Sequence, residues 1–301
     1  MNAALPEYRV QTHPLNRLEL AALWPVIYAS VFRAPVGREA LHGRLAGVRA
    51  SPEELSRALS GPALRDLIVE RNGDVWLRQP GLERMEAEFR MRRRATRELL
   101  RANEDILSFL RRRPGLRFAA LSGGCAHDAA DDGDIDVFVV TEPGRLWRTL
   151  LESTVVAKAR GWRKVLCLNY IVDATAQSLP GGDFYSAFEL VTLKPIAGER
   201  GYEDLLRANP WARPIFPNFF PAGVGGQNRG NLTPPTRAGQ LLEATARMIH
   251  RPYLRSRLPK GAGVELSAHL VRLHAIDHRP RVRTLFQNAL NRLSLEAPPW
   301  I

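Results

Sequence analysis

The chain has 301 residues, with 43 Lys or Arg against 31 Asp or Glu, so its formal net charge is +12. Its 45% hydrophobic and 25% charged residues are ordinary for a globular protein and exclude a disordered or fibrous chain. No apolar run approaches the roughly 18 residues that a membrane span needs. The positive charge predicts attraction to polyanions such as nucleoside triphosphates, RNA or DNA, without choosing among them.

The N-terminal segment and the cysteines bear on where in the cell the protein is located. The opening segment, MNAALPEYRVQTHP, lacks the apolar stretch and small-residue cleavage site of a signal peptide. The chain has two cysteines, Cys125 and Cys167, which show no metal-binding or disulfide spacing. This usage indicates two reduced thiols. We therefore expect a cytoplasmic protein with no membrane partner, and a loose tail over residues 1–13.

Residues 14–80 combine helices with a hairpin. Three segments have helical apolar spacing or a helix-start signal: residues 16–32, 37–45 and 51–67. The last begins with Ser51-Pro52, and Glu54 stands three residues after the serine, which is the pattern of a capping box. Two strand-like runs then flank Asn72-Gly73, a strong hairpin signal. Three helices followed by a hairpin are typical of a winged-helix domain.

The charges of this expected domain bear on DNA binding. Its third helix carries Arg57 and Arg65 against three acids, which is unfavourable for a helix that enters a major groove. The hairpin offers only Arg71 and Arg78. We therefore expect a scaffold or a contact surface for a protein partner, with DNA binding as the less favoured alternative.

The rest of the chain divides at changes of composition. Residues 81–113 predict a long Arg-rich connecting helix, either a solvated face or a phosphate-contacting stripe. Residues 114–208 alternate strand, acidic loop, strand, helix and strand, which predicts an α/β core. Residues 209–234 are rich in Pro, Gly and Asn and predict a linker. Residues 235–301 predict a C-terminal helical region, with helices over 236–258 and 263–294.

The acidic loop lies in LSGGCAHDAADDGDIDVFVV, residues 121–140. Asp134 and Asp136 are two residues apart at the head of a strand, so their carboxylates project from one face. Two such charges repel each other unless a cation lies between them, and Mg²⁺ suits one or two carboxylates together with substrate phosphates. Gly123 and Gly124, at the preceding turn, let backbone N–H groups approach phosphate oxygens.

These residues resemble the signature of the DNA polymerase β-like nucleotidyltransferase superfamily. The signature stands here as LSGG, nine residues, then DID followed by VFVV. The resemblance covers roughly residues 114–200, and the expected strands and helix around it fit. It implies a mixed sheet with flanking helices, an α+β or α/β fold, here preceded by a winged helix and followed by a helical region.

The resemblance also implies an activity and the residues that carry it. The activity is Mg²⁺-dependent (or Mn²⁺-dependent) transfer of a nucleoside monophosphate from an NTP to a hydroxyl of a small molecule, protein or RNA, with release of pyrophosphate. Ser122, Gly123 and Gly124 would cradle the triphosphate, while Asp134 and Asp136 would hold the metal. Cys125 and His127, in the same loop, and Arg148, in the following helix, are further candidates for nucleotide contact.

One position departs from the family pattern. Active members carry a third carboxylate in the third strand, where this chain has Asn169. A neutral amide cannot take a proton. Either Asn169 is a weak neutral ligand, or Asp173 or Glu189 supplies the acid, or catalysis is impaired. The lead hypothesis is therefore an enzyme with an unknown acceptor, and the rival is a winged-helix regulator that senses a nucleotide or binds DNA.

Overall fold

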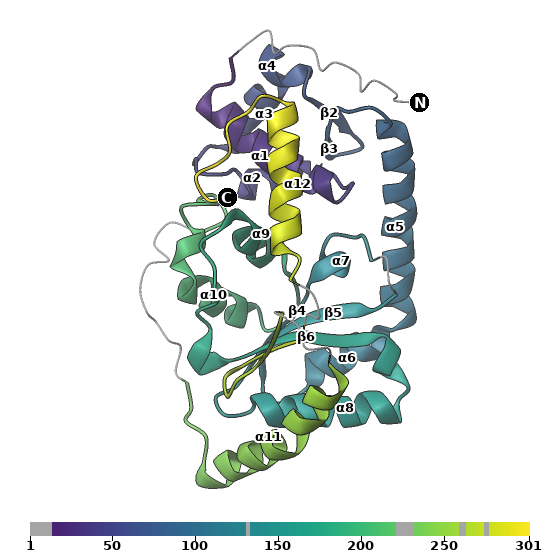
Figure 1. The fold of residues 1–301 in the computed structure, drawn as a ribbon, viewed down its shortest axis with the longest axis vertical. Helices are drawn as coiled ribbons and strands as arrows, with labels where there is room; N and C mark the ends of the chain where they lie inside the picture. Colours follow the sequence, from purple (N-terminus) through teal and green to yellow (C-terminus); the bar gives the residue numbers. More distant parts are fainter. Residues whose placement is uncertain (1–13, 131–132, 221–231, 259–262, 274–276) are drawn as a thin grey trace.

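The computed structural model describes residues 14–130, 133–220, 232–258, 263–273 and 277–301. The fold is α+β, with a six-stranded mixed sheet flanked by helices on both sides (Figure 1). A second, three-stranded sheet belongs to the N-terminal part. Within the described residues, no helix combines the length and the apolar character that crossing a membrane requires.

The N-terminal part has the expected helices and hairpin. Its elements are α1 (Arg17–Val31), β1 (Val36–Gly37), α2 (Arg38–Gly43), α3 (Pro52–Ser60), α4 (Pro62–Arg65), β2 (Ile68–Arg71) and β3 (Asp74–Leu77). The Ser51 capping box is present. Asn72 and Gly73 both have positive φ, as the tight hairpin turn requires. The expected third helix is divided after Ser60, because Pro62 has no N–H with which to continue the helical hydrogen bonds.

The Arg-rich segment forms two helices instead of the single one expected. They are α5 (Leu82–Ala102) and α6 (Glu104–Arg112), separated by Asn103. The Asn103 side-chain amide donates to the Leu99 carbonyl at 2.8 Å and closes the end of α5. Thr96, which is fully buried in α5, accepts the Ala130 backbone N–H at 3.0 Å. This helix therefore holds one part of the acidic loop in place.

The core confirms the expected order of strand, acidic loop, strand, helix and strand. Its first elements are β4 (Leu116–Leu121), α7 (Gly123–Ala126), β5 (Ile135–Thr141), α8 (Leu146–Ala159) and β6 (Leu166–Asp173). β4 pairs with β5 antiparallel, and β5 pairs with β6 parallel. α9 (Phe184–Thr192), β7 (Lys194–Ala197) and α10 (Glu199–Ala208) follow. The full strand order is β7-β4-β5-β6-β9-β8.

Alternate residues of β5 face two different hydrophobic clusters. Phe138 and Val140 pack with α9, α10 and α12 (Arg279–Arg292) on one side of the sheet. Val137 and Val139 pack with α6, α8 and α11 (Arg237–Arg257) on the other side. Figure 1 shows α8 and α11 below the sheet and α7, α9 and α12 above it. Asp136 shares the alternation of Phe138, so it belongs to the α9 side.

The C-terminal region differs from the sequence expectation. The helix expected over 236–258 is present as α11, but the one expected over 263–294 is wrong in its first part. There the chain forms β8 (Val264–Leu266) and β9 (Leu270–Leu273), and β9 pairs antiparallel with β6. β6 has apolar side chains on both faces, so both of its edges need partners, and fully buried Val271 belongs to the strand that covers one of them.

The expected linker over 209–234 is also partly wrong. Ile215 and Phe216 are fully buried, and both belong to the cluster that contains α9 and α12. Proline indicated irregular backbone correctly but gave no information about burial. Residues 221–231 of the expected linker, like the expected tail over 1–13, lie outside the described residues. Three short 3-10 turns complete the structure: η1 (Trp162–Lys164), η2 (Ala174–Ala176) and η3 (Pro210–Ala212).

A cluster of aromatic rings joins the N-terminal part to the core. Tyr28 of α1 is 1% exposed. Its ring centroid lies 4.6 Å from that of Phe188, 5.3 Å from that of Phe184 and 5.4 Å from that of Phe286. These partners come from α9 and α12. Because one hydrophobic cluster spans both parts, residues 14–80 do not have a core separate from that of the sheet.

Tyr28 tests this shared core. We expect Tyr28→Ala to lower the free energy of unfolding by about 3–5 kcal/mol, because it opens a cavity among three rings. Tyr28→Phe is the matched control, since the buried Tyr28 hydroxyl has no hydrogen-bond partner among the described residues. Its stability should stay within about 0.5 kcal/mol of the wild type. Urea unfolding followed by tryptophan fluorescence and circular dichroism measures both. Separate transitions for the two parts would contradict the shared core.

Candidate metal centre

The pairing of β4 with β5 brings the two ends of the acidic loop together. Leu121 lies opposite Val137 in the antiparallel register. The Ser122 backbone N–H then donates to the Asp136 carbonyl oxygen at 3.0 Å. The loop therefore leaves the sheet and returns to it at one point. The Gly-containing turn and the expected metal ligands meet there, as the sequence predicted.

The acid pair has a third neighbour that the sequence did not indicate. Asp134, Asp136 and Cys167 are all half-buried, and one possible ligand atom from each lies within 4.8 Å of the other two. The thiol arrives through the parallel register, in which Cys167 stands beside Asp136. Neighbours across a sheet project from the same face. The signal in the sequence that could have indicated this neighbour is the position of Cys167, two residues before Asn169. Residues two apart in a strand project from the same face.

Asn169 lies against the acid pair, although its neutral amide is not the expected carboxylate. Its side-chain Nδ2 donates to Asp136 Oδ1 at 2.7 Å. The side chain is 7% exposed, and its Oδ1 is buried without a hydrogen-bond partner in the described structure. Burial raises the pKa of the adjacent Tyr170 phenol, so this neighbour remains protonated at neutral pH. Through its hydrogen bond, the Asn169 amide orients Asp136, and its Oδ1 remains available as an acceptor.

Asp173 is not part of this centre. It stands beside Thr141 at the other end of the β5–β6 ladder. Its carboxylate accepts the backbone N–H of Gly144 at 2.7 Å and that of Thr175 at 2.9 Å, so it fixes two turns. Asp173 lies four residues after Asn169, and a regular strand would place the two side chains on one face. That expectation fails because a bulge adds one residue to β6 between the partners of Asp136 and Phe138, which reverses the alternation beyond it.

Two of the candidate nucleotide contacts lie elsewhere. Arg148 belongs to α8, on the opposite side of the sheet from Asp136, and its Nε donates to Glu152 at 2.7 Å. Cys125 is 1% exposed and packs in the cluster on the α8 side. Its thiol donates to the Asp134 carbonyl oxygen at 3.4 Å. The structure therefore brings neither side chain to the open side of the acid pair.

His127 and Glu189 lie together beside the end of α7. The His127 ring stacks on Phe188 and on Phe32, with centroids 6.0 Å and 6.5 Å away. Its Nε2 is 3.8 Å from Glu189 Oε1. The acid proposed as a third carboxylate is thus near the loop, and its nearest described ion-pair partner is this histidine. His127 is held by α1 and α9 together.

Asp128 anchors the loop to its surroundings. Its carboxylate lies 2.7 Å from Lys194 Nζ and 3.7 Å from Arg93 Nε. Arg93 of α5 also pairs with Asp74 of the hairpin at 2.9 Å. Asp128 has a positive φ of 54°, a conformation that these ion pairs help to hold. The contacts of Asp128 therefore hold the loop to β7 and α5.

The two glycines of the turn, Gly123 and Gly124, each permit a close approach. Gly123 has a φ of +53°, and a Cβ there would lie 2.5 Å from Asp136 Oδ2. A Cβ on Gly124 would lie 3.0 Å from the Ala129 carbonyl oxygen. Gly123 therefore lets the turn lie directly on the Asp136 carboxylate, and Gly124 lets it lie close to the Ala129–Ala130 backbone. The first N–H groups of a helix have no acceptor inside it, so this turn places backbone donors beside the acids.

The donor set fits a divalent cation. Two carboxylates and a thiol converge, and two further buried oxygens nearby, Ser122 Oγ and Asn169 Oδ1, lack hydrogen-bond partners in the described structure. Like charges at this distance repel, and a cation between them removes that repulsion. Oxygen ligands of this kind suit Mg²⁺ or Mn²⁺.

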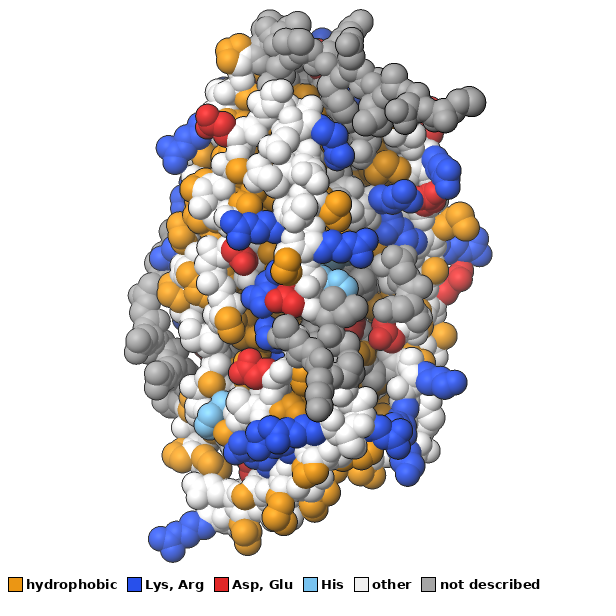
Figure 2. All heavy atoms as spheres, viewed as in Figure 1, with side chains coloured by type: hydrophobic (Ala, Val, Ile, Leu, Met, Phe, Trp, Pro, Cys, Tyr) orange, Lys and Arg blue, Asp and Glu red, His pale blue; other side chains and the backbone are white. Residues whose placement is uncertain are grey.

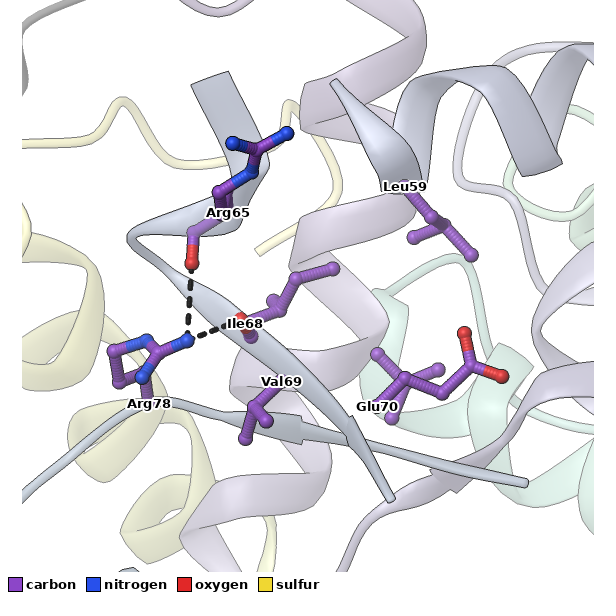
Figure 3. Close-up of a pocket in the computed structure, with 7 residues that line it drawn as sticks. Leu59, Arg65, Ile68, Val69, Glu70 and Arg78 are labelled. Carbon is purple, nitrogen blue, oxygen red and sulfur yellow. Dashed lines mark hydrogen bonds between the residues drawn. The ribbon is translucent and has the colours of Figure 1, made fainter. Parts of the chain in front are cut away.

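A second hollow, in the N-terminal part, has no comparable chemistry. It encloses about 210 Å³ between α3, α4 and the hairpin, and Leu59 and Ile68 line it (Figure 3). Arg78 donates from its rim to the carbonyl oxygens of Arg65 and Ile68. Arg71, the other arginine of the hairpin, pairs with Glu86 at 3.0 Å. The two arginines of the hairpin, which are too few to favour DNA binding, are thus bound within the chain.

Comparisons with known proteins give no further assignment. The chain matches no family model, no curated protein and no solved structure.

Gly123→Ala tests whether the turn must lie on Asp136. We expect a loss of affinity for Mn²⁺ of at least about 10-fold, because the added methyl group displaces the carboxylate. Gly133→Ala is the matched control: its φ is +76°, and an added Cβ meets nothing within 4 Å. It should carry a similar left-handed strain of about 1–2 kcal/mol and retain its metal affinity. Calorimetric titration with Mn²⁺ decides, and equal affinities in the two variants would contradict the assignment.

Asn169→Asp tests the amide. The change puts a carboxylate where a donor now lies 2.7 Å from Asp136 Oδ1, so the metal-free protein should lose about 1–3 kcal/mol of stability. A divalent ion should restore it and stabilise this variant more than the wild type. Asn72→Asp, at the exposed hairpin turn, is the matched control. Thermal unfolding with EDTA and with Mn²⁺ measures the difference, and identical metal responses in all three proteins would rule out a ligand position.

Proposed function

We propose that the protein is a divalent-metal-dependent nucleotidyltransferase that moves a nucleoside monophosphate from an NTP to a hydroxyl and releases pyrophosphate. One observation carries the proposal. The Ser122–Gly124 turn lies directly on the Asp134–Asp136 pair, so backbone donors for phosphate and carboxylates for a metal share one place. The sequence resemblance to polymerase β-like nucleotidyltransferases supports the same reading.

In this proposal the residues divide the work by charge. Asp134 and Asp136 hold Mg²⁺ or Mn²⁺, which neutralises the triphosphate when bound. The backbone N–H groups at Gly123 and Gly124 hold phosphate oxygens, and Asn169 keeps Asp136 oriented through its 2.7 Å hydrogen bond. Lys and Arg side chains are spread over the face drawn in Figure 2, with several acidic side chains near its middle. Such a field draws an anionic substrate toward the molecule.

Fewer residues are candidates for removing the proton from the acceptor hydroxyl. Asn169 cannot accept a proton, and Asp173 fixes turns at the other end of β6. Glu189, the remaining candidate, lies beside the loop, 3.8 Å from His127. We assign the deprotonation of the acceptor to this Glu189–His127 pair within the proposal. The acceptor can be a small molecule, a protein or an RNA.

A second candidate function is favoured by the same amide. An Asn in place of the third carboxylate is what a nucleotide-sensing protein without transfer activity would tolerate. The N-terminal helices and hairpin, in this reading, carry the signal to a protein partner. Binding without turnover distinguishes it from the enzyme.

The decisive experiment follows labelled phosphate. Wild-type protein is incubated with Mg²⁺ or Mn²⁺ and each α-labelled NTP, alone and with cell extract. We expect transfer of label, reduced more than about 100-fold in Asp134→Asn and Asp136→Asn, because metal-bound charge neutralisation is lost. Asp105→Asn, at an exposed position of α6, changes the net charge equally and should keep full activity.

Three outcomes separate the hypotheses. Transfer in the wild type and in Asp105→Asn alone supports the enzyme, and the labelled species identifies the acceptor. Unchanged transfer in Asp136→Asn would overturn the site. Metal-dependent NTP binding without transfer, in every extract tested, would establish the sensor instead.

A further inference from the structure

The thiol beside the acid pair gives the centre a donor that Mg²⁺ does not use. Cys167 Sγ and one oxygen each from Asp134 and Asp136 lie within 4.8 Å of one another. Mg²⁺ takes oxygen ligands, whereas thiolates select borderline-soft ions such as Zn²⁺. We propose that Cys167 is a metal ligand and that the centre binds Zn²⁺ more tightly than Mg²⁺.

The backbone fixes the thiol at this place. Cys167 stands beside Asp136 in the parallel β5–β6 ladder. The ladder resumes with Phe138 beside Tyr170, so the bulge follows Cys167 and leaves its pairing intact. A side chain held by a central strand keeps its position better than one on a loop. Cys125, the other thiol of the chain, is buried in a hydrophobic cluster, and its Sγ donates to the backbone carbonyl oxygen of Asp134 at 3.4 Å.

A second, independent observation points to a ligand. Asn169 is 7% exposed, and its Nδ2 contacts Asp136 at 2.7 Å, so its side chain is aimed into the cluster. Its Oδ1 is buried without a hydrogen-bond partner in the described structure, which is costly unless an ion or a bound molecule satisfies it. Three protein donors with a further polar group nearby are the usual number for a zinc site that keeps one position open.

Binding of Zn²⁺ through the thiol changes the charge of the centre. When the ion binds, the Cys167 thiol releases its proton to solvent, and the thiolate and two carboxylates face a dication. The three negative donors exceed the charge of the ion by one, and the buried Asn169 amide donates a hydrogen bond to Asp136. Mg²⁺ would use the carboxylates alone. Under the proposed function, on which this last step rests, Zn²⁺ then competes with Mg²⁺ and regulates nucleotide transfer.

Cobalt reports the thiolate directly. The full-length protein, freed of metal with a chelator, is titrated with Co²⁺ while the near-ultraviolet absorption is recorded. A thiolate-to-cobalt charge-transfer band is expected in the wild type and in Cys125→Ser, and Zn²⁺ should abolish it while equal Mg²⁺ does not. Cys167→Ser and Cys167→Ala should lose the band, with Zn²⁺ affinity reduced at least about 10-fold and Mg²⁺ affinity unchanged.

Each outcome either supports or overturns the proposal that Cys167 is a metal ligand. No charge-transfer band in the folded wild-type protein, or a band that persists in Cys167→Ser, overturns the proposal without reference to any variant's activity. A band lost in Cys125→Ser alone also overturns it. A band that behaves as expected, in a protein that transfers no label, supports the zinc ligand and refutes the nucleotidyltransferase. Label transfer without the band does the reverse.

Discussion

The hydrogen bond from the Ser122 N–H to the Asp136 carbonyl oxygen, at 3.0 Å, closes the acidic loop against the sheet. The rest of the centre is arranged around the same residue. The Asp136 carboxylate meets the Gly123 backbone on one side and the Asn169 amide on the other. Cys167 stands beside it in the neighbouring strand. Because a single side chain has three fixed neighbours, a small displacement of Asp136 disturbs every other contact.

Ion pairs surround this arrangement. Two basic side chains beside the acidic loop form ion pairs. Lys194 and Arg93 both pair with Asp128, and Arg93 also pairs with Asp74. These ion pairs hold the loop to α5 and β7. The closely spaced carboxylates of Asp134 and Asp136, with Cys167, form a cluster that could hold a metal ion, and a cation there would lower their mutual repulsion.

The N-terminal part and the loop share contacts through the aromatic cluster. Tyr28 packs among rings of α9 and α12, while Phe32, at the end of the same helix, stacks on His127. Asp74 of the hairpin holds Arg93, which also reaches Asp128. The helices and hairpin are therefore packed into the support of the candidate centre. A partner that binds to the N-terminal part would act on residues one contact away from the loop.

Local signals in the sequence determined much of this protein. Capping residues, the Asn72-Gly73 turn and the alternation of strand, acidic loop and strand predicted most elements, and the spacing of Asp134 and Asp136 predicted their convergence. Only the tertiary structure decided the register. The bulge in β6 turns Asp173 away from the face of Asp136, whereas Cys167 precedes the bulge and stays beside Asp136. β9 joined the sheet from a segment expected to be helical. Strand pairing is set by contacts between distant residues, so no local pattern contained it.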